Sequence, residues 1–423
     1  MPEPADASLL IYAPVPLHRD GAQLLLEDQA CNGLRLWAAH FAQVTAIMPV
    51  SDAPAPASWV PVERVGPALE RIRLLPVPQA WTLGRFLRAR PAVRRLIRDE
   101  IARADYLSFA IGGLVGDWGA LACAEACRMG RPHAVWTDRV ESEVTRMEAV
   151  GAPRLRRRLK AQLIWRPMAA LERRAVRRAT LGLFHGQATF DHYARFSRDP
   201  HLVHDIHVRA ADLIPAKALA AKAARAGAGG PLRLVYVGRA DPMKGPLDWI
   251  EALELAAQAG VDLRASWIGG GEQIEALRTR IAQGPLAGQV TAPGFLSDRA
   301  AVLGALRDAD ALLFCHRTPE SPRVLIEALV SGAPLIGYEG PFQQSLIADN
   351  GAGALVPDGR PDLLAQELAL LHRHRATLAR MIAATAKAAH GHDDETAFAH
   401  RSRIILTHLP PPQDRAGDPH RPR

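Results

Sequence analysis

The stretch His316–Pro334, HRTPESPRVLIEALVSGAP, decides how the second half of the chain folds. It follows the apolar run ALLFC, begins with turn-forming residues, and continues as an apolar helical pattern that stops at Gly332. Ser321 is a favourable N-cap and Pro322 suits the first helical position, so the pattern predicts a helix from 323 to 331. A short buried strand that leads directly into a helix is typical of parallel α/β sheets.

The same alternation of short apolar runs and helical patterns extends along most of the chain. In the first half the predicted strands are 9–14, 43–50, 106–111, 133–138 and 181–186. In the second half they are 232–238, 263–269, 289–294, 311–316, 334–339 and 353–357. These patterns predict two α/β domains with parallel sheets, 1–214 and 231–391, joined by a small-residue linker, 215–230, which is either extended or partly helical. A helix is expected over 392–409 and a disordered tail over 410–423.

The bulk properties agree with a globular protein of two domains. The chain has 423 residues, of which 48% are apolar and 23% charged. Its four cysteines show no metal-binding spacing, which fits a reducing compartment. We expect a cytoplasmic protein, because the sequence shows neither a signal peptide nor an apolar run of about 18 residues.

The net charge of +8 is concentrated in one segment, residues 154–178, RLRRRLKAQLIWRPMAALERRAVRR. Basic residues alternate there with Leu159, Leu163 and Trp165, and Pro167 is expected to break or kink the helix. One interpretation is a solvated helix face. The other is a peripheral contact with anionic lipid, on the inner face of the membrane. Nucleic acid is disfavoured, because no helix-turn-helix or aromatic-rich sheet motif accompanies the segment.

Three loops after predicted strands carry the residues suited to an anionic ligand. Gly238 ends one strand, and Arg239 and Lys244 follow it, so that two cations can reach one diphosphate. Gly270 is the centre of a triple-glycine turn, where a ring or phosphate can approach the backbone. The third loop is Ser321 to Val324, including Arg323, whose backbone N–H groups open the predicted helix and favour a phosphate.

Glu327 lies further along that helix. Its carboxylate could accept hydrogen bonds from sugar hydroxyls. The alternatives are that it is simply exposed, or that it pairs with a basic neighbour.

These motifs together resemble the nucleotide-sugar-binding domain of the family 4 retaining glycosyltransferases, which have the GT-B fold. The matching blocks are VGRADPMKG, IGGGEQIEAL, the region from APGFLSD to LIGY that includes the opening stretch, and NGAGALVPDG. The resemblance implies two Rossmann-like domains facing a cleft, with the helix at 392–409 crossing back to the first domain. It also implies that Arg239 and Lys244 hold the donor diphosphate, that Glu327 binds the donor ribose, and that Glu320 borders the donor sugar as a catalytic candidate.

The spacing of the two acids departs from the family pattern. The family has seven residues between them, whereas six separate Glu320 from Glu327 here, and Pro319 occupies the position of the first acid. The loop either brings the carboxylate of Glu320 to the same point by a different turn, or uses the backbone N–H groups of 321–324 instead.

The first half resembles the family more faintly and is expected to hold the acceptor. Asp138 ends a predicted strand where the family often has a His or an acid near the reacting sugar, so it is a second catalytic candidate. Gly21, in the loop after the first strand, Gly113, in a glycine-rich turn, and His185, at another strand end, are candidates for the acceptor side.

The activity that the resemblance implies is transfer of a hexose-type sugar from a nucleoside diphosphate sugar to a hydroxyl of a saccharide or lipid-linked saccharide, with retention. Such transfers build bacterial surface polysaccharides and glycolipids. No metal or cofactor is expected, since no Asp-x-Asp motif ends a predicted strand. The alternatives are a noncatalytic nucleotide-sugar-binding protein and an NAD-dependent oxidoreductase, for which the G-x-G-x-x-G fingerprint is missing. The base, the sugar and the acceptor stay open.

Overall fold

The computed structural model describes residues 5–21, 23–51, 53–56, 59–151, 155–204, 206, 208–318 and 322–410. The chain forms two compact units. The first unit is Met1–Asp205 with Ala397–Arg423, and the second unit is Ile206–Thr396. No helix among the described residues has both the length and the apolar character needed to cross a membrane.

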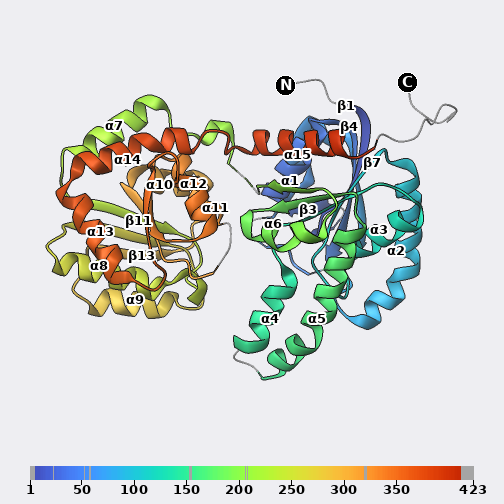
Figure 1. Ribbon diagram of the computed structural model, residues 1–423, viewed down its shortest axis with the longest axis horizontal. Helices are drawn as coiled ribbons and strands as arrows, with labels where there is room; N and C mark the ends of the chain where they lie inside the picture. Colours follow the sequence, from blue (N-terminus) through green and yellow to red (C-terminus); the bar gives the residue numbers. More distant parts are fainter. Residues whose placement is uncertain are drawn as a thin grey trace. The chain divides into compact units, whose positions relative to one another are not determined.

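The second unit is built on a parallel sheet whose strand order is β13-β12-β11-β14-β15-β16 (Figure 1). Its strands are β11 (Leu232–Val237), β12 (Leu263–Ile268), β13 (Val290–Gly294), β14 (Ala311–Phe314), β15 (Leu335–Tyr338) and β16 (Gly353–Val356). The direction of winding reverses at β11, which pairs with β12 on one side and β14 on the other. In open α/β sheets, ligands bind beyond the carboxyl ends of the strands at such a reversal.

The helices of this unit form two layers (Figure 1). One layer contains α8 (Pro246–Gln258), α9 (Ile274–Gln283) and α13 (Pro361–Arg373). The other contains α7 (Ala216–Gly227), α10 (Arg299–Asp308), α11 (Arg323–Val330), α12 (Pro341–Ile347) and α14 (Arg375–Ala388). Two short 3-10 turns, η3 (Ala210–Asp212) and η4 (Pro242–Lys244), precede α7 and α8.

The predicted linker 215–230 is wrong in its main part, because α7 is a packed helix of the second unit. Its buried face contains Leu219, Lys222 and Ala226. The ammonium of Lys222 donates hydrogen bonds to the backbone oxygens of Leu306, at 3.0 Å, and Ser331, at 3.2 Å. Small residues suggested an interdomain linker, partly helical at most, but they also allow α7 to pack closely against α14.

The first unit contains a larger sheet with seven parallel strands in the order β10-β9-β8-β7-β1-β4-β6. They are β1 (Ala5–Tyr12), β4 (Phe41–Ser51), β6 (Ile72–Pro78), β7 (Tyr106–Ala110), β8 (Ala134–Thr137), β9 (Leu181–His185) and β10 (Pro200–Val203). Here the winding reverses at β1, between β4 and β7.

The segment after β1 was predicted to be a loop, and this prediction is wrong. It forms the hairpin of β2 (Leu17–Asp20) and β3 (Gln23–Glu27), which extends the sheet from β4 toward β5 (Trp59–Pro61). Gly21 occupies the hairpin turn with φ 58°. The hairpin is stable there because Leu17 and Leu26 are both fully buried in the core.

Both faces of this sheet are covered, as its alternating side chains require. Leu10 and Tyr12 contribute to the core under α2 (Leu83–Arg103), α3 (Trp118–Arg128) and α5 (Leu155–Arg178). Leu9 and Ile11 contribute to the core on the other face, under α1 (Asp28–Ala38) and η1 (Val62–Arg71). The remaining elements are α4 (Glu141–Gly151), α6 (Gln187–Tyr193) and η2 (Ala194–Phe196); α5 runs through Pro167 as one helix.

The last helix, α15 (Asp394–His408), begins in the second unit and belongs to the first unit from Ala397 onward. Phe398 packs its ring against Trp37 of α1, with the ring centroids 5.1 Å apart. Ile404, Ile405 and Leu409 lie in the same core. The tail predicted for 410–423 lies outside the described residues from 411 onward.

Candidate functional site

The loops that follow β11, β12 and β14 are hydrogen-bonded into one assembly at the carboxyl edge of the second unit's sheet. The N–H of Ala240 donates to the oxygen of Gly270 at 2.6 Å, and the N–H of Gln273 donates to the oxygen of Ala240 at 2.7 Å. The N–H of Arg317 donates to the oxygen of Met243 at 2.9 Å. The reversal of strand order therefore coincides with a fixed arrangement of the three predicted ligand-binding loops.

Two of the three glycines in the turn after β12 are required by this arrangement. A Cβ on Gly269 would lie 2.0 Å from the oxygen of Gly238, and one on Gly271 would lie 2.5 Å from the nitrogen of Ala240. Both residues also have positive φ angles, 149° and 141°. Around Gly270 the space is open, so this is the glycine at which a ligand can approach.

The two predicted cations differ in their surroundings. Arg239 is 78% exposed, and its Nε lies 2.9 Å from Oδ2 of Asp241. Lys244 is half-buried at the end of η4, directly before Gly245. A Cβ on Gly245 would lie 2.4 Å from the oxygen of Cys315, so only glycine lets the loop pass this close to the end of β14.

His316, which sequence reasoning did not single out, lies beside Lys244. It is buried at the end of β14, and its Nε2 lies 2.8 Å from the hydroxyl of Tyr236 in β11. Burial, and secondarily the charge of Lys244, hold the pKa of His316 well below its usual value, so the imidazole is neutral at pH 7. Nδ1 of His316 and the hydroxyl of Thr318 are buried without a hydrogen-bond partner in the described part of the chain.

The helix of the opening stretch begins at Arg323, as predicted, and ends at Val330, one residue before the predicted end. Pro322 is the N-cap, with φ −69° and ψ 124°, and α11 begins at Arg323. Arg323 is exposed and Val324 is buried. Glu320 and Ser321, predicted to border the sugar and to cap the helix, lie outside the described residues together with Pro319.

Glu327 is paired with a basic neighbour, which was one of the alternatives left open by the sequence. Its Oε1 accepts a hydrogen bond from Nη1 of Arg299 at 3.0 Å, and its side chain is 14% exposed. Arg299 also donates through Nη2 to Oδ2 of Asp212 at 3.1 Å. The guanidinium, from the start of α10, fixes the orientation of the Glu327 carboxylate.

In the first unit, Gly113 lies in a loop organised by a carboxylate that sequence reasoning missed. Asp117, the N-cap of α3, accepts hydrogen bonds from the N–H groups of Gly112 and Gly113, both at 3.1 Å, and of Ala120 at 2.9 Å. Burial raises the pKa of Asp117 although these donors oppose the shift. Its position directly before the helical pattern that lies between the strands predicted at 106–111 and 133–138 was the available signal.

Asp138 and His185 follow neighbouring strands and reach the same edge of the sheet. Asp138 is exposed in the turn after β8, and its backbone oxygen accepts from the hydroxyl of Thr189 at 3.4 Å. His185 ends β9, is buried, and stacks on Trp136 at 5.5 Å. Gly21 is not brought to them, because β7, β1 and β4 lie between its hairpin and β8.

A second missed carboxylate, Glu141, connects the loops after β7 and β8. A Cβ on Gly112 would lie 2.9 Å from Cγ of Glu141. Burial raises the pKa of Glu141 against the opposing effect of Arg139, to which it is ion-paired at 2.6 Å. A carboxyl with a raised pKa at the ligand-binding edge of a sheet is suited to exchange a proton with a bound hydroxyl.

Comparison with known proteins finds sequence similarity to glycosyltransferases in the second unit. Residues 221–388 match the family model of the glycosyl transferases group 1. A GDP-mannose-dependent alpha-(1-6)-phosphatidylinositol dimannoside mannosyltransferase of Mycobacterium tuberculosis is 32% identical over 152 residues, which are 35% of this chain and 38% of the relative. The amylovoran biosynthesis glycosyltransferase AmsK of Erwinia amylovora is 30% identical over 182 residues, 41% of this chain and 44% of the relative. The chain thus matches less than half the length of either relative.

Solved structures show the same fold for both units. Anabaena HepE in complex with UDP-glucose has a TM-score of 0.62 at 15% identity, covering 95% of this chain and 100% of HepE. WaaG, a glycosyltransferase involved in lipopolysaccharide biosynthesis, has a TM-score of 0.61 at 15% identity, covering 94% of this chain and 100% of WaaG. The fold is therefore α/β with two Rossmann-like units, that of the GT-B glycosyltransferases.

Proposed function

We propose that this protein is a family 4 retaining glycosyltransferase that moves a hexose from a nucleoside diphosphate sugar to a hydroxyl of a saccharide or lipid-linked saccharide. The observation that carries the proposal is the hydrogen-bonded assembly of loops at the carboxyl ends of β11, β12 and β14, with Lys244 and Arg239 beside it. The relatives act in polysaccharide and glycolipid synthesis by their names, and we propose the same broad role here.

The donor diphosphate is proposed to lie between the two cations and the start of α11. Arg239 offers a fork of donors from the solvent side, and Lys244 a point charge from the buried side. The N–H groups of the first turn of α11 add partial positive charge. Together these groups stabilise the diphosphate as it departs, so that no strong general acid is needed.

Polar groups of the donor can satisfy atoms that otherwise lack partners. Burying an unpaired polar atom costs on the order of 1–3 kcal/mol, and Nδ1 of His316 and the hydroxyl of Thr318 are two such atoms in the described part of this edge. Because His316 is neutral, it can offer a hydrogen bond without adding charge. Glu327, oriented by Arg299, is proposed to accept from the ribose hydroxyls.

The transfer is proposed to proceed on the front face of the sugar. The bond from the anomeric carbon to the phosphate oxygen breaks, giving an oxocarbenium-like transition state. The acceptor oxygen then bonds to the same face of that carbon, and its proton passes to the departing phosphate. This route needs no protein nucleophile and no metal; Asp138 is proposed to line the acceptor side and Glu320 to border the donor sugar.

The test is a thermal-shift screen with GDP-mannose, UDP-glucose and their free diphosphates. A donor present at about 100 times its dissociation constant should stabilise the protein by roughly 2.7 kcal/mol. Lys244→Ala should weaken that binding by about 1.5–3 kcal/mol, since a charge-assisted contact is lost. Lys217→Ala, which removes an exposed lysine of α7, is the matched control. Equal binding by Lys244→Ala and the control would show that the diphosphate lies elsewhere.

A noncatalytic nucleotide-sugar-binding protein is the second candidate, favoured by the altered spacing of Glu320 and Glu327. The two candidates differ in turnover. Slow hydrolysis of the bound donor, seen as released nucleoside diphosphate, is expected of the enzyme, whereas a binding protein returns the donor intact.

Peripheral contact with an anionic membrane is proposed for the amino-terminal half of α5. Leu155, Leu159 and Leu163 follow one another at four-residue intervals and are 69%, 52% and 77% exposed. Arg156, Arg158 and Lys160 are exposed beside them, and each adds about 1 kcal/mol near an anionic surface. An apolar stripe flanked by cations is the pattern of helices that lie in the membrane interface.

Vesicle sedimentation tests this contact. Replacing Arg156, Arg158 and Lys160 with Gln should reduce cosedimentation with anionic vesicles and leave nucleotide binding unchanged. The control removes the same charge from the second unit through Arg373, Arg380 and Lys387, all exposed on α13 and α14. If the α5 variant cosediments as strongly as the control variant and the unaltered protein, α5 does not contact lipid. The same conclusion holds if the unaltered protein does not cosediment with the vesicles.

A further inference from the structure

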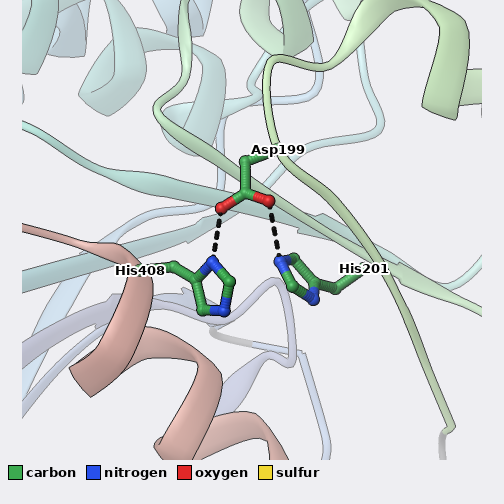
Figure 2. Close-up of side chains that lie close together, drawn as sticks. All are labelled: Asp199, His201 and His408. Carbon is green, nitrogen blue, oxygen red and sulfur yellow. Dashed lines mark hydrogen bonds and ion pairs between the residues drawn. The ribbon is translucent and has the colours of Figure 1, made fainter.

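Three side chains meet at the edge of the first unit's sheet, away from the residues discussed above. Asp199 directly precedes β10, His201 lies within β10, and His408 is the last residue of α15. Oδ1 of Asp199 lies 2.9 Å from Nε2 of His201, and Oδ2 lies 2.7 Å from Nδ1 of His408 (Figure 2). The cluster therefore joins an edge strand to a helix that is 209 residues away in sequence.

The arrangement of the three side chains suits a divalent cation. One ligand atom from each lies within 4.8 Å of the other two. Figure 2 shows that one nitrogen of each imidazole faces the carboxylate, so that the donor atoms converge. Zinc binds imidazole nitrogen and carboxylate oxygen at roughly 2.0–2.2 Å, which sets tetrahedral ligands about 3.3 Å apart. The two hydrogen-bonded distances need to open by only about half an ångström to reach this value.

We propose that Asp199, His201 and His408 bind a zinc ion, which completes its coordination with water. Two imidazoles and one carboxylate are a common zinc donor set. The ion would replace the two hydrogen bonds to Asp199 with shorter coordinate bonds from Nε2 of His201 and Nδ1 of His408. All three side chains are partly exposed, so an ion can enter from solvent.

The position of the cluster assigns it a structural role. β10 is parallel to β9, and His201 pairs in register with Leu183, two residues before His185. Asp199 is thus at the amino end of β10, whereas Asp138 and His185 mark the carboxyl edge. The ion would fasten the end of α15 to the sheet and would not touch the acceptor side.

Zinc titration of the full chain, without a histidine tag, tests the site. Calorimetry with Zn²⁺ and the visible absorption of bound Co²⁺ should both show one equivalent. Affinity should fall at least tenfold in His201→Gln and in His408→Gln, since each removes one of three protein ligands. His374→Gln, an exposed histidine of the second unit, is the control and should bind as the unaltered protein does.

A second measurement separates zinc binding from a simple hydrogen-bonded triad. Zinc should raise the unfolding midpoint of the unaltered protein and of His374→Gln, and should not raise it in His201→Gln or His408→Gln. Failure to bind one equivalent, or equal affinity in the control and the two ligand variants, overturns the proposal. Because the readouts do not use the donor nucleotide, the result is independent of the proposed transferase activity.

Discussion

At the scale of single residues, the ion pair between Arg299 and Glu327 fixes one carboxylate of the candidate site. The guanidinium holds two carboxylates, those of Glu327 and Asp212, at 3.0 and 3.1 Å. A carboxylate fixed in this way loses little further side-chain entropy when a ligand hydroxyl binds to it. Pairing and ligand binding are therefore compatible at Glu327.

Variants of Glu327 and Glu320 should distinguish contacts with the nucleoside diphosphate from contacts with the transferred sugar. In the proposed site, Glu327→Ala removes a charged hydrogen-bond acceptor for the ribose hydroxyls, so affinity for the sugar nucleotide and for the free nucleoside diphosphate should fall together, by about 1.5–3 kcal/mol. Glu320→Ala should spare the free diphosphate, which carries no sugar, and lower turnover. Isothermal titration and a donor-hydrolysis assay measure the contrast.

The control for this pair is Glu395→Ala, which removes an exposed carboxylate at the start of α15. A Glu320→Ala variant with full turnover would mean that Glu320 is only a surface charge. Unchanged nucleotide affinity in Glu327→Ala would show that Glu327 does not contact the nucleotide and only pairs with Arg299.

Residue by residue, the sequence could predict what depends on neighbours along the chain. Arg239, Lys244 and Gly270 follow predicted strands at short spacing, and the structure places all three at loops of one edge. The contact between His316 and Tyr236 joins residues 80 apart, and its partners are fixed only when β14 pairs with β11. The cluster of Asp199 and His408 depends likewise on where α15 packs.

At the scale of elements, α7 shows how a helix of mostly small residues is held in place. Lys222 donates to carbonyl oxygens of two different segments, at the end of α10 and just after α11. Its ammonium is buried, and burial lowers the pKa of Lys222 from 10.5 to about 7. The helix is therefore held partly by a group that can lose its charge near neutral pH.

This buried lysine should make the stability of the second unit depend on pH. Between about pH 7 and pH 10 the unfolded chain keeps the Lys222 proton while the folded chain releases it, so stability rises with pH in that window. The slope should approach, at most, about 1.4 kcal/mol per pH unit. Chemical denaturation at pH 7 and pH 9 measures it.

Lys222→Met should remove this increase, whereas Lys217→Met, on the exposed face of α7, should keep it. The same slope in Lys222→Met as in the unaltered protein would show that another group titrates in this range.

The glycine turn after β12 is a second element whose shape can be tested. Gly271→Ala places a Cβ 2.5 Å from the backbone of Ala240 and strains a positive φ. The two loops must then separate, and donor binding should fall at least tenfold, as judged by isothermal titration. Gly304→Ala is the control, because an added Cβ there meets nothing within 4 Å. Equal donor affinity in both variants would show that the loop contact does not shape the site.

At the scale of the whole molecule, α15 contributes to the first unit although it follows the second in sequence. The alternation of apolar runs predicted both parallel sheets and most of their strands. It did not predict β2, β3, β5, β6 and β10. These strands are short or lie at sheet edges, where a strand is stable with fewer buried side chains and therefore lacks a continuous apolar run. Which core α15 joins depends on contacts such as that of Phe398 with Trp37, which local pattern does not specify.

Truncating Phe398 should destabilise the first unit. The side chain is 4% exposed and packs on Trp37, so Phe398→Ala should lower the free energy of unfolding by about 3–5 kcal/mol. Thermal unfolding measures the loss, and Phe295→Ala, which removes a ring that is 76% exposed, is the matched control. Equal midpoints for the two variants would show that α15 contributes little to the core.

The return of α15 also sets an order of events during synthesis. The second unit is one continuous segment, and it can fold as soon as it has left the ribosome. The core of the first unit lacks Ile404, Ile405 and Leu409 until the last part of the chain emerges. The first unit is therefore incomplete while the ribosome synthesises the second unit. During that time its uncovered apolar surface is available to chaperones.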